Sequence, residues 1–126
     1  MHVVVRIPPA TPAPAPLSRA SQLSFPLPTL RLALAAGIHA LFVDDAELRD
    51  QLRRASKSAF LNVAEGLPAN RSPLKRRYFT SAIGSLCEVQ AALDLGGAIG
   101  VIASDEVARL QPLAVRVVNM AHKLNR

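Results

Sequence analysis

Four polar side chains near the middle of the chain are of the types that acid–base chemistry uses: Asn62, Glu65, Ser85 and Glu88. Two carboxylates can act as general acid and general base when both reach one substrate. Glu65, however, ends one predicted helix, whereas Glu88 lies in the middle of the next. Antiparallel packing would separate them, so we predict a structural polar network, with Glu88 paired to Arg54 or Arg53, and no catalytic site.

The residues that bind metals or act as nucleophiles are scattered. The single cysteine, Cys87, excludes an intrachain disulfide, and its apolar neighbours predict a thiol in the core. The three histidines lie at positions 2, 39 and 122, too far apart in sequence to predict a metal site. Gly84-Ser85 lacks the glycine run and the Lys-Ser/Thr pair of a phosphate-binding loop. We therefore predict a protein that is not an enzyme and needs no cofactor.

The positive charge is concentrated in one stretch. Eight basic and two acidic residues lie between Arg49 and Arg77, which gives this stretch the whole net charge of +6. Such a local excess favours an anionic partner, although a solvated surface is the alternative. Aromatic residues are few here, which favours contact with phosphates over stacking on bases. The residues predicted to contact nucleic acid are Arg49, Arg53, Lys57, Arg71, Lys75, Arg76 and Arg77.

Composition separates a leader from a folded part. Seven of the ten prolines lie in residues 8–28, and such a segment lacks the amide donors of regular structure. We predict a flexible Pro-rich leader over residues 1–26 and one domain over 27–126. The domain is rich in Ala, Leu and Val and poor in aromatic residues, which is typical of close-packed helices. The apolar runs are too short for a signal peptide or a membrane span, so we expect a cytoplasmic protein.

Helical periodicity predicts four helices in that domain. The first runs from Thr29 to Phe42, with Gly37 marking the close approach of a neighbour. The second opens at Asp44, with Glu47 completing a capping pair, and ends before Gly66 as its C′ residue. The third begins at Ser72-Pro73, with Ser72 as N-cap, and stops near Leu95.

The fourth helix starts at Ser104 and has a coiled-coil-like spacing of apolar residues. These are Val107, Leu110, Ala114, Val117, Ala121 and Leu124. Val115, Val118 and Met120 lie outside this row and predict a subunit interface. Short connections between four helices predict an all-α, up-down-up-down antiparallel four-helix bundle.

Two segments of this bundle carry a resemblance to a known family. The first contains Gln51, Arg54, Ala55, Ser58 and the run Asn62-Val63-Ala64-Glu65-Gly66. The second contains Ala82, Gly84, Ser85 and Glu88, preceded by Tyr78 or Phe79. Together they resemble the four-helix-bundle proteins encoded in intervening sequences of bacterial 23S ribosomal RNA genes. The likeness extends over about residues 27–124.

The resemblance implies a homopentamer of bundles. It also implies a likeness in fold to the accessory protein of diversity-generating retroelements, which binds nucleic acid and a reverse transcriptase through a basic surface. We interpret the motif residues as structural, with close helix contact at Gly84 and Ser85 and register set by Asn62 and Glu88.

Two functions remain open from the sequence. One is a non-enzymatic oligomeric bundle that binds RNA, DNA or a nucleoprotein partner through its basic patch. The other is a protein-interaction or scaffold module whose arginines form salt bridges between subunits.

Overall fold

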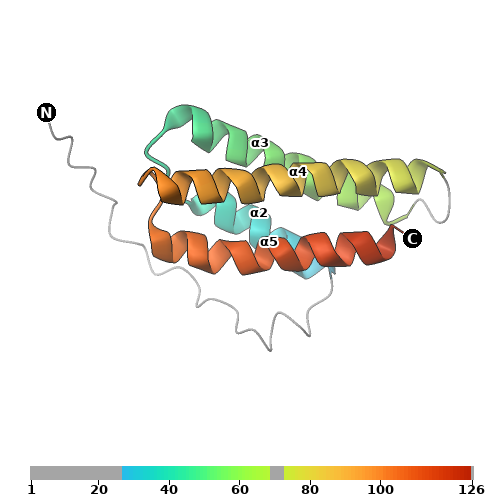
Figure 1. Ribbon diagram of the computed structural model, residues 1–126. Coiled ribbons are helices and arrows are strands. Elements are labelled where there is room, and N and C mark those ends of the chain that lie inside the picture. Colours follow the sequence, from blue (N-terminus) through green and yellow to red (C-terminus); the bar gives the residue numbers. More distant parts are fainter. Residues whose placement is uncertain (1–26, 69–72, 126) are drawn as a thin grey trace, which may run out of the picture.

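The computed structural model describes residues 27–68 and 73–125, and these form four helices (Figure 1). The helices are α2 (Leu27–Ala40), α3 (Ala46–Gly66), α4 (Pro73–Ala98) and α5 (Ser104–Leu124). The colours in Figure 1 show that successive helices run in opposite directions. The described residues contain no strand, so the predicted all-α four-helix bundle is confirmed. The predicted leader over residues 1–26, together with Arg71 and Ser72, lies outside the described residues.

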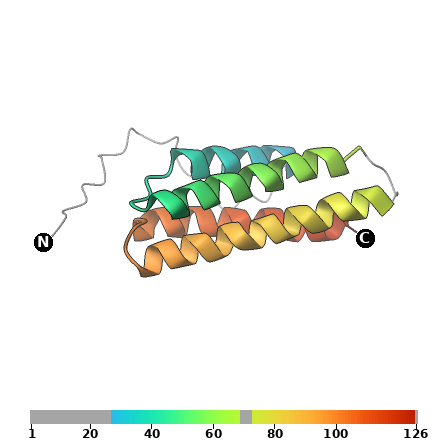
Figure 2. The ribbon, with the colours of Figure 1, turned by 90° about the horizontal axis from the view of Figure 1, so that it is seen from above.

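Each helix packs against two neighbours. The contacting pairs are α2 with α3, α3 with α4, α4 with α5, and α5 with α2, as the view from above shows (Figure 2). One hydrophobic core fills the space between them, and Phe79 is the largest of its fully buried side chains. The other fully buried large side chains are Leu30, Ile38, Leu52, Val63, Leu86, Val89, Leu93, Leu110 and Val117. The predicted apolar row of the fourth helix is buried from Leu110 to Ala121.

The loops at one end of the bundle are held to each other. The backbone N–H of Asp44 donates to the carbonyl of Val101, at an N···O distance of 3.0 Å. The predicted cap at Asp44 is wrong by one residue. Asp45 caps α3 instead, and its carboxylate accepts from the N–H of Leu48 at 2.8 Å. The predicted start of α5 at Ser104 is confirmed.

The surroundings of three glycines test the packing predictions made for them. A Cβ added at Gly37 would lie 2.7 Å from the Cδ2 atom of Leu110, so the predicted close approach is confirmed. A Cβ added at Gly84 would meet nothing within 4 Å, so the predicted close contact there is wrong. Gly66 is the last residue of α3 and not a left-handed C′ residue. It is buried against the ring of Phe79.

Two further local predictions about α4, its end near Leu95 and the core position of Cys87, are wrong. The helix continues through the Gly96–Gly97 pair to Ala98, and the chain turns at Gly100, which has a φ of +80°. Cys87 is exposed, because the core face of α4 passes through its neighbour Leu86 and through Val89.

Candidate nucleic-acid interface

Basic side chains from two helices meet along the line where α2 packs on α3. Arg53 on α3 donates from Nη2 to the backbone carbonyl of His39 at the end of α2, at a distance of 3.4 Å. Arg49 and Lys57 lie one turn before and one turn after Arg53 on α3, so they share its side of the helix. Arg49 is half-exposed, and its Nε atom lies 3.6 Å from the carboxylate of Asp50.

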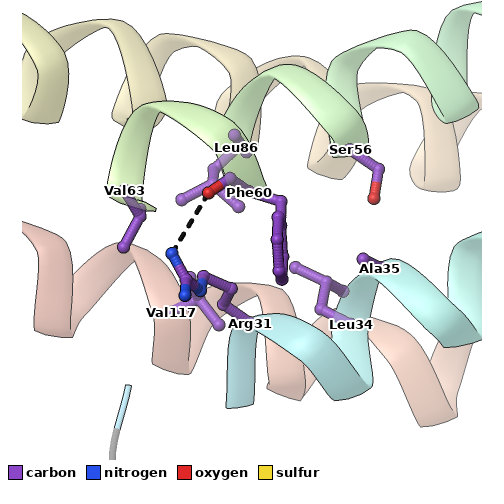
Figure 3. A pocket seen from close by; sticks show the side chains of 9 residues that line it. Arg31, Leu34, Ala35, Ser56, Phe60, Val63, Leu86 and Val117 are labelled. Carbon is purple, nitrogen blue, oxygen red and sulfur yellow. Dashed lines mark hydrogen bonds between the residues drawn. The ribbon is translucent and has the colours of Figure 1, made fainter. Parts of the chain in front are cut away.

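Arg31 extends this row on α2. Its Nη1 atom donates to the carbonyl of Phe60 at 3.2 Å, and its guanidinium carbon lies 4.3 Å from the centre of the Phe60 ring (Figure 3). The ring face attracts the cation, and burial lowers the pKa of the Arg31 guanidinium from its ordinary value. We call Arg31, His39, Arg49, Arg53 and Lys57 together the α2–α3 seam.

The pKa of His39 depends on the electrostatic potential at the α2–α3 seam. Its pKa is lowered from the ordinary value of 6.5, first by burial and then by the positive charges of Lys57 and Arg53. Both cations disfavour a further positive charge on the imidazole. The potential at this point on the surface is therefore positive, as a site for an anion requires.

The other predicted basic residues lie elsewhere. Arg76 and Arg77 are exposed in the first turn of α4, and Lys75 is half-buried, with its Nζ atom 6.0 Å from the centre of the Phe79 ring. Phe79 packs on Gly66, so this group lies beside the end of α3, whereas Arg49 lies in its first turn. The single predicted patch is thus divided into the α2–α3 seam and a second group at the start of α4.

The polar motif residues on α3 and α4 connect the two helices. The hydroxyl of Ser85 donates to the hydroxyl of Ser58 at 2.9 Å. Asn62 donates from Nδ2 to the carbonyl and to the hydroxyl of Ser58, at 2.8 and 3.2 Å. The predicted close helix contact at Ser85 is consistent with its bond to Ser58. Asn62 was predicted to set the register together with Glu88, but its bonds to Ser58 stay within α3.

The predicted ion pair of Glu88 is not formed. Among the described residues the ion pairs are Arg49 with Asp50 and Arg109 with Glu106. Arg53 turns away from α4 toward His39, and Glu88 is exposed beside Arg54 in an open groove between α3 and α4. Since Ser58 pairs with Ser85 in antiparallel helices, Glu88 lies opposite Ala55 and Glu65 opposite Tyr78. The two carboxylates that could have formed an acid–base pair are therefore not brought together.

The groove between α3 and α4 has a volume of about 370 Å³ and polar walls. We call it the α3–α4 groove. Its lining residues are Glu47, Gln51, Arg54, Ala55, Ser58, Ser85 and Glu88. The motif residues Arg54, Ser85 and Glu88 thus face solvent, whereas the remaining predicted structural residues Asn62, Glu65 and Gly66 follow along α3 toward its end.

Sequence reasoning missed Arg31, His39 and the buried Ser56. Arg31 and His39 lie eight residues apart on α2, a helical spacing that could have placed them on one face. The sequence carries no signal that this face packs on α3. Ser56 is 3 % exposed, and its hydroxyl has no hydrogen-bond partner among the residues that the structure describes. It lines a small cavity of about 10 Å³ together with Leu34, Ala35 and Phe60 (Figure 3).

We expect Ser56→Ala to stabilise the fold by about 1 kcal/mol. A buried hydroxyl without a partner loses its hydration and gains no bond, and alanine also has the higher helix propensity. Urea unfolding of the variant and of wild type measures the difference. Ser58→Ala is the matched control, because it removes a hydroxyl that has two partners, and it should destabilise. An equal loss of stability in both variants would contradict this account of Ser56.

The described residues contain no group of three or more His, Cys, Asp or Glu side chains that could hold a metal ion. None of the helices described combines the length and apolarity needed to cross a membrane.

Comparison with known proteins identifies the family. No curated protein matches the chain. The family model described as 23S rRNA-intervening sequence protein matches residues 38–123, from the end of α2 almost to the end of α5. The match contains both motif segments and all of α3 and α4, and it covers more than half of the chain. The chain therefore belongs to the 23S rRNA-intervening sequence protein family.

Proposed function

We propose that this chain is a non-enzymatic cytoplasmic protein that binds the phosphate backbone of nucleic acid through the α2–α3 seam. The observation that carries the proposal is the position of Arg53 and Lys57 beside His39, whose pKa is lowered by burial and then by these two cations. Arg31 adds a third cation farther along the same seam, against Phe60. Phosphate oxygens accept hydrogen bonds from guanidinium and ammonium groups and neutralise their charge. Arg31 is already oriented by its contact with Phe60, so less of its conformational entropy is lost on binding.

The contact is independent of nucleotide sequence. The seam offers cations and one half-buried ring, Phe60, that is already covered by Arg31. Base stacking, which needs open aromatic faces, is therefore not favoured at Phe60. Arg76 and Arg77 form a second contact at the start of α4, and Arg71 and Lys75 belong to the same predicted group.

A filter-binding titration against duplex and single-stranded RNA and DNA tests this function. Displacement of counterions from phosphates makes the logarithm of affinity fall linearly with the logarithm of salt concentration. We expect binding at about 50 mM salt that weakens steeply by about 200 mM. Absence of binding at low salt, or an affinity indifferent to salt, would refute phosphate contact.

The proposal includes assembly into a homopentamer. Several large apolar side chains are exposed on the bundle, which favours burial between copies. They include Leu32, Leu61, Leu74, Leu95, Ile99 and Val115, whereas Val118 and Met120 are used at least partly in packing on the core. Repetition of the seam on each copy would multiply weak phosphate contacts through avidity. Light scattering measures the mass, and a clean monomer at micromolar concentration would contradict the assembly.

A further inference from the structure

The α3–α4 groove has charged side chains that the nucleic-acid proposal does not use. Glu47, Arg54 and Glu88 all line it, and none of them forms an ion pair among the described residues. Arg54 and Glu88 would be expected to bond each other if their role were to fix helix register. That role is filled by the hydroxyl pair of Ser58 and Ser85 at one end of the groove.

All the lining residues except Glu47 belong to the two segments through which the chain resembles its family. Gln51, Arg54 and Glu88 are exposed, whereas Ala55 is buried and forms part of the floor. Small side chains on both helices, among them Ala55 and Ser85, leave the space that the polar side chains surround. The two family segments therefore supply the residues of an open polar surface as well as residues that pack in the core.

We propose that the α3–α4 groove binds a basic peptide segment of a protein partner, with its arginine or lysine side chains held by Glu47 and Glu88. Two carboxylates against one guanidinium give the groove a formal charge of −1 within a chain of net charge +6. Such a site repels phosphate and attracts a cation. Guanidinium fits best, because its fork of five N–H donors matches carboxylate oxygens.

The other walls suit a peptide backbone. Arg54 can donate to peptide carbonyls, and the amide of Gln51 can both donate and accept. Along α3 the groove extends from Glu47 to Ser58, which is about 16 Å at the rise of an α-helix. About five residues of extended chain span that length. Glu88 lies opposite Ala55, about 12 Å along the axis from Glu47, which places two basic residues four positions apart in the peptide.

The test uses the full chain and a capped heptapeptide that carries two arginines separated by three glycines. We expect saturable binding of this peptide in isothermal titration calorimetry, although the protein is basic. The same peptide with citrulline in place of both arginines keeps the shape and loses the charge. It should not bind.

Variants locate the site. Glu88→Gln and Glu47→Gln should each weaken the peptide about tenfold, because each removes a charge-assisted hydrogen bond. Glu65→Gln is the matched control: it makes the same change at an exposed position of α3 outside the groove. It should bind as wild type does. Equal weakening in all three variants, equal binding of the citrulline peptide, or no binding to wild type would overturn the proposal. The result is independent of nucleic-acid binding, since none of these variants alters the α2–α3 seam.

Discussion

Phe79→Ala is expected to lower the free energy of unfolding by about 3–5 kcal/mol, the usual range for a buried phenylalanine. Phe79 is completely buried and is the largest of the fully buried side chains. Its loss leaves a cavity where α4 packs on the end of α3. Because a domain of this kind is stable by only about 5–15 kcal/mol, the change removes a large share of its stability. Urea unfolding measures the loss, and Phe42→Ala, at a ring that is 36 % exposed, should cost much less.

The packing of Phe79 on Gly66 gives a sharper version of this experiment. A Cβ at position 66 would lie 2.9 Å from the Cε2 atom of Phe79, so Gly66→Ala should destabilise wild type. Once the ring is removed by Phe79→Ala, the same change should cost much less, since only the approach to the Cβ atom of Tyr78, at 3.3 Å, remains. A double-mutant cycle measures this difference. An effect of Gly66→Ala that is the same in both backgrounds would contradict the contact.

Neutralising two cations of the α2–α3 seam is expected to have the largest effect on function. Arg53→Gln combined with Lys57→Gln should weaken nucleic-acid binding about tenfold at low salt. It should also reduce the salt slope by about 2, one for each lost phosphate contact. Filter binding at several salt concentrations gives both quantities. Arg116→Gln combined with Lys123→Gln removes the same charge from α5 and is the matched control.

The two interpretations of the arginines give different results in this pair of variants. If Arg53 and Lys57 contact phosphates, the seam variant binds less and keeps its assembled mass in light scattering. If they form salt bridges between subunits, the mass falls and binding is not selectively lost. Equal weakening by the seam variant and the α5 variant would show that net charge alone governs the affinity.

Helical spacing was sufficient to predict the elements and much of the core. The apolar row of α5 was predicted in its place and the N-cap of α3 within one residue, because both depend on local sequence and backbone geometry. The neighbour that covers each face depends on tertiary packing, which spacing does not contain. Gly37 and Gly84 look alike in sequence, yet Gly37 meets Leu110 and Gly84 faces open space. Cys87 was misplaced for the same reason.

In the candidate site, too, spacing along one helix could be predicted and contacts between helices could not. The row of Arg49, Arg53 and Lys57 could be read from its spacing of four residues. Its partners Arg31 and His39 could not, because they reach the row only through the packing of α2 on α3. Arg54 and Glu88 carry opposite charges on neighbouring helices, which predicted a bond. The small residues between the helices leave them apart at the groove.

The imidazole of His39 provides the most direct test of binding at the α2–α3 seam. NMR titration of the His39 ring protons, assigned with His39→Gln, should give a pKa below 6.5 in the free protein, as burial and the cations Lys57 and Arg53 require. A bound phosphate favours the protonated ring, so an RNA oligonucleotide should raise this pKa. Binding then takes up a proton, and affinity should rise as the pH falls through this range. An oligonucleotide that binds without changing the pKa of His39 would contradict the account.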